Sequence, residues 1–151
     1  MRRIFLVAVA GALLLALSAG TALAINIIQC KNVPCNGTNN ADRIFERIGN
    51  HKEDRIYARD GNDVVDASKY NRDSDKVRGD GGNDRIRTDD GDGRDTVNCG
   101  SGRDIAVIDP GDRAATNCQD VRTNFTGSAE EFATGSYEDI IRDSQDARGP
   151  S

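Results

Sequence analysis

Apolar residues in the middle of the chain occur singly and at regular intervals, between stretches rich in Gly, Asp and Asn. Most of them lie two positions after an aspartate. The aspartates are Asp42, Asp54, Asp63, Asp75, Asp84, Asp95, Asp104 and Asp112, and the residues two positions later are Ile44, Ile56, Val65, Val77, Ile86, Val97, Ala106 and Ala114. This pattern predicts three-residue strands, each with one inward side chain, separated by turns.

The intervals between successive aspartates alternate between short and long, running 12, 9, 12, 9, 11, 9 and 8 residues. The repeating unit is therefore a pair of strands that spans about 20 to 21 residues. Such a period is typical of a solenoid, in which each turn buries its apolar side chains against the next turn. We predict an all-β fold, a parallel β-roll or β-solenoid with two short strands per turn and an inward column from Ile44 to Ala106.

Residues 79–87 (GDGGNDRIR) resemble the nonapeptide G-G-x-G-x-D-x-U-x of the RTX, or haemolysin-type, calcium-binding repeats. Residues 58–66 (ARDGNDVVD) and 99–107 (CGSGRDIAV) match it less fully, and the resemblance covers about residues 37–114. The first glycine is often missing, and every second unit is two or three residues longer than nine. The resemblance implies a parallel β-roll with Ca²⁺ between stacked loops, bound by the sixth-position aspartates and by loop carbonyls.

The nine-residue units supply the candidate metal ligands. Those ending at Asp63, Asp84 and Asp104 each keep a glycine two residues earlier, at Gly61, Gly82 and Gly102. They are 21 and 20 residues apart, so they stack on one edge of the roll, and we expect Ca²⁺ between neighbouring loops. Among the long loops only residues 88–95 (TDDGDGRD) resemble a ligand loop, which adds Asp95 as a candidate.

A metal-free alternative stands beside this interpretation. Asp, Asn and Gly are common turn residues in any protein. Basic residues directly follow several of the aspartates, at Arg43, Arg55, Lys76 and Arg85. Ladders between these basic side chains and the carboxylates are expected to hold a metal-independent scaffold.

The N-terminus has the pattern of a signal peptide. Arg2 and Arg3 precede an apolar run over residues 4–17, and Ala22-Leu23-Ala24 forms a cleavage site. Residues 1–24 are therefore expected to be removed and the protein to be secreted, with a retained anchor as the alternative. No membrane insertion is expected after cleavage.

Charge and cysteine content fit an extracellular chain. Without Arg2 and Arg3, 18 basic residues face 25 acidic ones, a net charge of −7 that disfavours binding to nucleic acid. Outside the cell the cysteines are expected to form disulfides. Cys99 and Cys118 are 19 residues apart, nearly one turn of the solenoid, so we predict that they pair across adjacent turns. Cys30 would then pair with Cys35 and close an N-terminal cap, residues 25–36.

Catalysis is not expected. The single histidine, His51, lies in a polar stretch, and paired acids such as Asp89 and Asp90 have little apolar sequence around them to line a pocket. The sequence therefore predicts a secreted, non-enzymatic calcium-binding module, structural or adhesive, whose partners are calcium ions and cell-surface or matrix components.

The β-roll is expected over residues 37–122, followed by a tail over residues 123–151. In the tail, Ser128-x-x-Glu131 and Ser136-x-x-Asp139 fit helix caps, with a helix over 137–147. However, TGSAEEF at 126 and TGSYEDI at 134 repeat at an interval of eight residues, which favours a decayed terminal turn. Residues 149–151 are expected to be disordered.

Overall fold

The computed structural model describes residues 25–30, 34–46, 52–70 and 72–148. The predicted signal peptide, His51 and the predicted disordered end at 149–151 lie outside the described residues.

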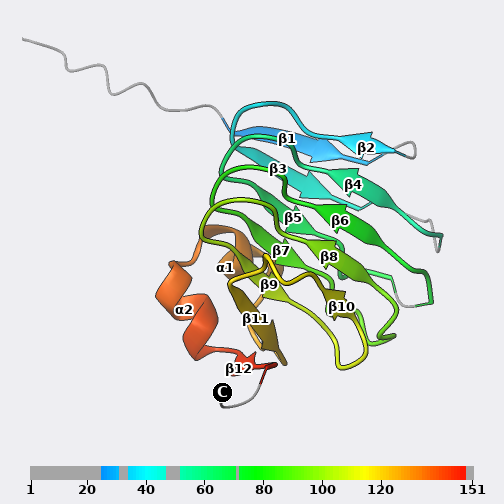
Figure 1. Cartoon of the computed structure of the whole chain (residues 1–151), viewed down its shortest axis with the longest axis vertical. Coiled ribbons are helices and arrows are strands. Elements are labelled where there is room, and N and C mark those ends of the chain that lie inside the picture. The colour runs from blue at the N-terminus through cyan, green and yellow to red at the C-terminus, as the bar shows by residue number, and fades with distance from the viewer. Residues whose placement is uncertain (1–24, 31–33, 47–51, 71, 149–151) are drawn as a thin grey trace, which may run out of the picture.

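The chain winds between two sheets, and its turns stack down the long axis of the molecule (Figure 1). The larger sheet contains, in spatial order, β1 (Asn26–Gln29), β3 (Asp42–Phe45), β5 (Val64–Asp66), β7 (Arg85–Arg87), β9 (Ile105–Val107), β11 (Asp120–Thr123) and β12 (Gln145–Asp146). The smaller sheet contains β2 (Cys35–Asn36), β4 (Arg55–Tyr57), β6 (Lys76–Arg78), β8 (Thr96–Asn98) and β10 (Arg113–Ala114). Strand pairs are parallel except β11 with β12. The predicted parallel β-roll is thus confirmed.

The strand register follows the sequence period. In the larger sheet Ile44 pairs with Val65 and Val65 with Ile86, each one turn of 21 residues apart. In the smaller sheet Ile56 pairs with Val77 in the same way. Residues two positions after each aspartate therefore lie above one another along the solenoid.

A narrow core runs between the two sheets. Its central column is the predicted one, with each member at most 1% exposed: Ile44, Ile56, Val65, Val77, Ile86, Val97 and Ala106. Because successive side chains of a strand point to opposite faces, the residues on either side of each column member point outward. Ala58 and Ala67 add small side chains to the same cluster. Each of these strands adds only one of the predicted side chains to the core, so the loops must contribute to stability.

Both predicted disulfides are present. Cys99 and Cys118 bridge adjacent turns with a Cα–Cα distance of 5.0 Å. Cys30 and Cys35 join β1 to β2 with a Cα–Cα distance of 5.3 Å. The first bridge ties the last turns of the solenoid together, and the second closes its N-terminal end.

Two short helices cover part of the outer face of the larger sheet, beside β9 and β11 (Figure 1). They are α1 (Ala129–Thr134) and α2 (Tyr137–Arg142). Helices this short are not stable alone in water, so their packing must hold them. Phe132 and Ile140 provide it, because both are buried against Ile105 and Val107 of β9.

The tail therefore forms the helical alternative rather than the favoured decayed turn. Ser128 and Ser136 each cap a helix and form a capping box, with Glu131 and Asp139 respectively. The second helix ends at Arg142, and the chain then pairs as β12 with β11 instead of continuing to residue 147. The interval of eight residues reflects two similar caps, not a turn of the solenoid.

Removal of the Cys99–Cys118 bridge should destabilise the last turns. The bridge closes a loop of 19 residues, for which chain entropy gives about 3 kcal/mol. We expect the double variant Cys99→Ala, Cys118→Ala to lose roughly that free energy of unfolding in urea. The Cys30–Cys35 bridge closes a loop of only five residues. The matched variant Cys30→Ala, Cys35→Ala should therefore lose about 2 kcal/mol of the free energy of unfolding. A larger loss from the second pair would contradict this order.

Candidate metal-binding edges

The loops form two edges of the solenoid. We call the loops at residues 58–63, 79–84 and 99–104, which precede β5, β7 and β9, the nine-residue edge. The loops at residues 67–75, 88–95 and 108–112, which precede β6, β8 and β10, form the long-loop edge. Each loop ends in one of the periodic aspartates, so both edges carry a column of carboxylates.

On the nine-residue edge the aspartates form a ladder with backbone amides. The amide of Asp42 donates to Oδ1 of Asp63 at 2.8 Å, and the amide of Asp63 donates to Oδ1 of Asp84 at 2.9 Å. The amide of Asp84 donates in turn to Oδ1 of Asp104 at 2.8 Å. Gln119 ends the ladder, since its Oε1 accepts the amide of Asp104 at 3.0 Å. Each carboxylate therefore joins its own turn to the one before it.

The second oxygen of each ladder carboxylate has no such partner. Oδ2 of Asp63, Asp84 and Asp104 is buried and accepts no hydrogen bond, although each residue is at most 1% exposed. Burial raises the pKa of Asp63 from 3.8 to about 7, against the amide of Asp42, which lowers it. Burial likewise raises the pKa of Asp84 to about 7, and the charges of Asp63 and Asp104 add to the effect. These carboxylates need either a proton or a cation.

Glycines allow the loops of this edge to stack closely. Gly82 and Gly102 have φ angles of 128° and 138°, a region that side chains rarely adopt. A Cβ atom on Gly82 would overlap the carbonyl oxygen of Gly61, and one on Gly102 would overlap that of Gly82. The predicted glycines Gly61, Gly82 and Gly102 are thus required by contact between turns.

Oxygens of two turns meet at Gly79. A Cβ atom on Gly79 would overlap both Oδ2 of Asp84 and the carbonyl oxygen of Cys99. Gly37 has the same surroundings, formed by Oδ2 of Asp42 and the carbonyl of Ala58. A carboxylate oxygen beside a loop carbonyl is the mixture of ligands that Ca²⁺ takes, so these residues fit the ion in chemistry.

The long-loop edge repeats the ladder. The amide of Asp54 donates to Oδ1 of Asp75 at 2.8 Å, that of Asp75 to Asp95 at 2.7 Å, and that of Asp95 to Asp112 at 2.8 Å. Oδ2 of Asp75 and of Asp95 is again buried without a hydrogen-bond partner. The pKa of Asp75 is raised to about 7 and that of Asp95 to about 8, and burial is the largest cause of both shifts.

Extra carboxylates gather only on this second edge among the described residues. Asp73, Asp90 and Asp92 form one group whose ligand atoms lie within 4.8 Å of one another, and Asp92, Asp95 and Asp112 form another. Of the residues predicted as ligands from the sequence, the structure brings Asp95 into such a group. The sequence interpretation did not name Asp73, Asp90, Asp92 or Asp112 as ligands, although it singled out the loop at residues 88–95 that contains two of them. For Asp73 and Asp92 the available signal was a second aspartate two or three residues before a ladder aspartate.

The basic residues that follow the aspartates point away from the ladder carboxylates. Arg43 pairs with Glu130 at 2.7 Å, while Arg55 and Lys76 pair with Glu53 at 2.6 and 3.0 Å. The ladder partners are backbone amides rather than these side chains, because the basic residues lie on the outer faces of the sheets. The expected Asp–Arg ladders are therefore replaced by Asp–amide ladders in the described part of the chain.

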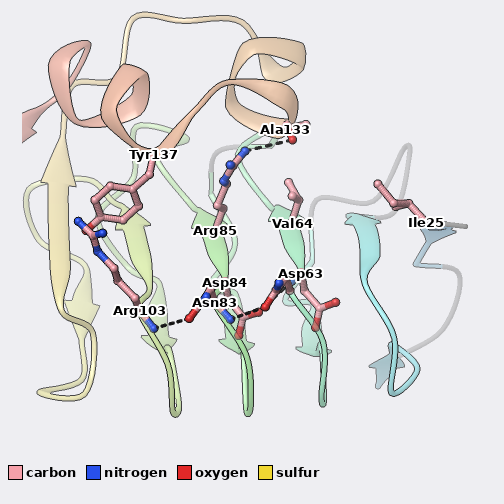
Figure 2. Close-up of a pocket in the computed structure, with 10 residues that line it drawn as sticks. Ile25, Asp63, Val64, Asn83, Asp84, Arg85, Arg103, Ala133 and Tyr137 are labelled. Atoms are coloured by element: carbon pink, nitrogen blue, oxygen red, sulfur yellow. Dashed lines mark hydrogen bonds between the residues drawn. The ribbon is translucent and has the colours of Figure 1, made fainter. Parts of the chain in front are cut away.

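A groove of about 400 Å³ lies between the larger sheet and the helices, and Asp63 and Asp84 line it (Figure 2). Arg85 donates across it to the carbonyl of Ala133 at 3.2 Å. Arg103 stacks on the ring of Tyr137, with 4.1 Å between the guanidinium carbon and the ring centroid. The two arginines hold the helices against the sheet, and the groove borders the nine-residue edge.

The chain matched no protein-family model, no curated protein and no solved structure. The likeness to haemolysin-type repeats therefore rests on the motif residues alone. Within the described ranges, no helix has the length and apolar character needed to cross a membrane.

The raised carboxylate pKa values predict how stability depends on pH in the absence of metal. A group whose pKa is higher in the folded chain stabilises the fold below its unfolded pKa, and this contribution is lost as pH rises through the folded pKa. For Asp63, Asp75 and Asp84 the loss begins near the unfolded pKa of 3.8 and is complete just above the folded pKa of about 7. We expect the melting temperature of the full chain in chelator to fall between about pH 4 and about pH 8 and to level off above that.

An amide at one ladder position should weaken this dependence. Asp84→Asn keeps an oxygen for the amide of Asp63 but has no charge to bury. We expect a shallower fall for this variant, and no change for Glu138→Gln, which removes an exposed charge. A melting temperature that rises across the same pH range in chelator would contradict the raised pKa values.

Proposed function

We propose that this chain is a secreted calcium-binding β-solenoid, a non-enzymatic structural or adhesive module whose folding is assisted by Ca²⁺ between stacked Gly/Asp loops. The proposed ligands on the nine-residue edge are Asp63, Asp84 and Asp104 with neighbouring loop carbonyls. Proposed partners are calcium ions and, outside the cell, cell-surface or matrix components.

The observation that carries this proposal is the column of buried carboxylate oxygens without partners at Asp63, Asp84 and Asp104. Burial of an ionised carboxylate is costly unless an opposite charge or hydrogen bonds compensate it. Ca²⁺ accepts six to eight oxygens at about 2.3 to 2.6 Å and tolerates irregular geometry. The meeting of carboxylate and carbonyl oxygens at Gly79 supports the choice of this ion.

Secretion fits the same chemistry. The predicted signal peptide and the two disulfides favour an oxidising compartment. Where Ca²⁺ is scarce, repulsion among the carboxylates would keep the acidic chain unfolded. Where Ca²⁺ is plentiful, its binding to the folded state alone would add to the free energy of folding.

The second candidate function is a metal-independent extracellular scaffold. The Asp–amide ladders and the two disulfides favour it, because both join adjacent turns without any ion. In this case the ladder carboxylates would hold protons rather than cations. The two candidates therefore differ in what neutralises Oδ2 of residues such as Asp84.

Circular dichroism of the full chain separates the two candidates. We expect the strand signal at neutral pH to strengthen with millimolar Ca²⁺ and to weaken after chelation. Mg²⁺ at the same concentration serves as the control for ionic strength. An identical strand signal in Ca²⁺ and in chelator would favour the metal-independent scaffold.

Among the ladder residues of the nine-residue edge, Asp84 should matter most for calcium-dependent folding. It lies between Asp63 and Asp104, and both of their charges act on it. Under the proposal it is shared by two ions, whereas Asp63 and Asp104 each border one of those two inter-loop sites. We therefore expect Asp84→Asn to reduce the Ca²⁺-induced rise in melting temperature more than Asp63→Asn or Asp104→Asn. Equal effects of the three variants would place the ions elsewhere.

A further inference from the structure

The long-loop edge carries carboxylates that the nine-residue motif does not contain. We propose that Asp73, Asp90, Asp92, Asp95 and Asp112 form a site for two divalent cations, with Asp92 shared between them. One ion would lie among Asp73, Asp90 and Asp92, and the other among Asp92, Asp95 and Asp112. The inference rests on the proposed function for the choice of Ca²⁺, but it concerns the opposite edge of the solenoid.

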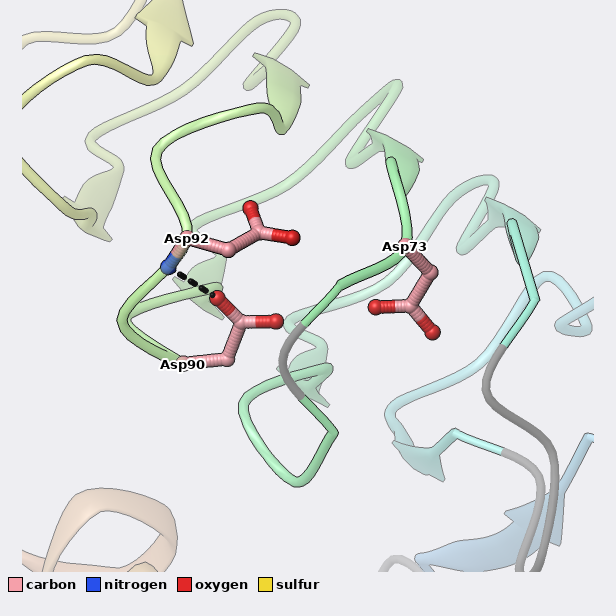
Figure 3. Close-up of side chains that lie close together, drawn as sticks. All are labelled: Asp73, Asp90 and Asp92. Atoms are coloured by element: carbon pink, nitrogen blue, oxygen red, sulfur yellow. Dashed lines mark hydrogen bonds between the residues drawn. The ribbon is translucent and has the colours of Figure 1, made fainter.

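Three successive turns supply these residues. Asp73 lies in the loop between β5 and β6, Asp90 and Asp92 lie between β7 and β8, and Asp112 lies between β9 and β10. Figure 3 shows Asp90 and Asp92 on one loop, with Asp73 facing them from the neighbouring turn. The two groups therefore bridge adjacent turns, as an ion that stabilises stacking must do.

Backbone amides orient the shared carboxylate. Asp92 accepts the amide of Arg72 on the preceding turn at 2.8 Å and the amide of Arg94 on its own turn at 3.0 Å. Asp112 is fixed in the same way by the amides of Asp95 and Asp109, at 2.8 and 2.9 Å. Ligands held in place by their surroundings lose little freedom when an ion binds.

A buried oxygen without a partner marks the second group independently of the clustering. Asp95 is 1% exposed, and its Oδ2 accepts no hydrogen bond. Its ligand atom lies within 4.8 Å of those of Asp92 and Asp112. Oδ2 of Asp75, directly below Asp95 in the same ladder, is also buried and accepts no hydrogen bond. Such oxygens are rare in folded proteins because their desolvation is not compensated.

Basic side chains do not pair with four of these five carboxylates. Among the described residues, no ion pair reaches Asp90, Asp92, Asp95 or Asp112. Arg72 and Arg94 contribute backbone amides to Asp92. Four ionised carboxylates at such short separations repel one another strongly unless protons or a cation neutralise them.

The number and type of ligands indicate two hard divalent cations. Five carboxylates carry a charge of −5, which two divalent ions reduce to −1. Oxygens on opposite sides of one Ca²⁺ are about 5 Å apart, whereas around Mg²⁺ they are about 4 Å apart. The ligand atoms of each group lie within 4.8 Å of one another, so one Ca²⁺ can contact all three. Asp90, Asp92 and Asp112 are partly exposed, so solvent reaches the site.

Calcium titration of the full chain tests the assignment. After chelator treatment, Ca²⁺ binding is measured calorimetrically for the wild type, Asp92→Asn and Asp112→Asn. We expect Asp92→Asn to lower the number of bound Ca²⁺ ions by two. We expect Asp112→Asn to weaken the affinity for one ion by at least roughly 10- to 100-fold, the loss that changes to outer-shell residues produce. Glu138→Gln removes one exposed charge from α2 and should bind as the wild type does.

Melting temperatures separate loss of binding from loss of folding. In chelator, Asp92→Asn relieves repulsion among the carboxylates, so we expect it to melt at a higher temperature than the wild type. In saturating Ca²⁺ the order should reverse. A variant that melts at a lower temperature in both conditions, with unchanged stoichiometry, would overturn the site.

The same titration of Asp84→Asn distinguishes this inference from the proposed function. If Asp84→Asn alone lowers the stoichiometry, the long-loop site is wrong and the nine-residue edge binds the metal. If Asp92→Asn alone lowers it, the long-loop site stands and the ions of the nine-residue edge are wrong. If the wild type binds no Ca²⁺, both fail.

Discussion

The structure depends on one interaction, a carboxylate oxygen that accepts the backbone amide of the aspartate one turn earlier. On the nine-residue edge this bond joins Asp63 to Asp42, and on the long-loop edge it joins Asp75 to Asp54. The bond fixes the register of each turn, because a slip by one residue would leave both the amide and the carboxylate without partners. Short strands then follow at fixed positions, and their central side chains stack within each of the two sheets and point into the core between them.

The ladder also buries carboxylate oxygens whose negative charge must be neutralised in the folded chain. One oxygen of each carboxylate is used for stacking, and the other is buried without a donor at positions such as Asp84 and Asp95. With only a narrow apolar core, the solenoid has little stability to offset repeated burial of charge. A proton neutralises these carboxylates at low pH, and under the proposed function a cation would neutralise them near pH 7. The proposed metal dependence and the predicted pH dependence therefore have the same origin, the buried carboxylates of the ladders.

The sequence was sufficient to predict what the period controls. The alternating intervals predicted the parallel roll, the inward side chains and the Cys99–Cys118 disulfide, since residues about 20 apart must lie on adjacent turns. The Cys30–Cys35 disulfide then followed from the two remaining cysteines. It did not separate helices from a decayed turn after residue 123, because Ser128 and Ser136 cap helices with the residues that also suggest a repeat. The grouping of Asp73 with Asp92 depends on the paths of loops of unequal length, which the period does not determine.

Anomalous diffraction from crystals grown in saturating Ca²⁺ tests most directly whether cations neutralise the buried carboxylate oxygens. The account predicts peaks about 2.3 to 2.6 Å from Oδ2 of Asp84 on one edge, and from the carboxylate of Asp92 on the other. The metal sites would then account for the oxygens that accept no hydrogen bond within the protein. Crystals in which neither edge holds a peak, with the ladder intact at neutral pH, would contradict it.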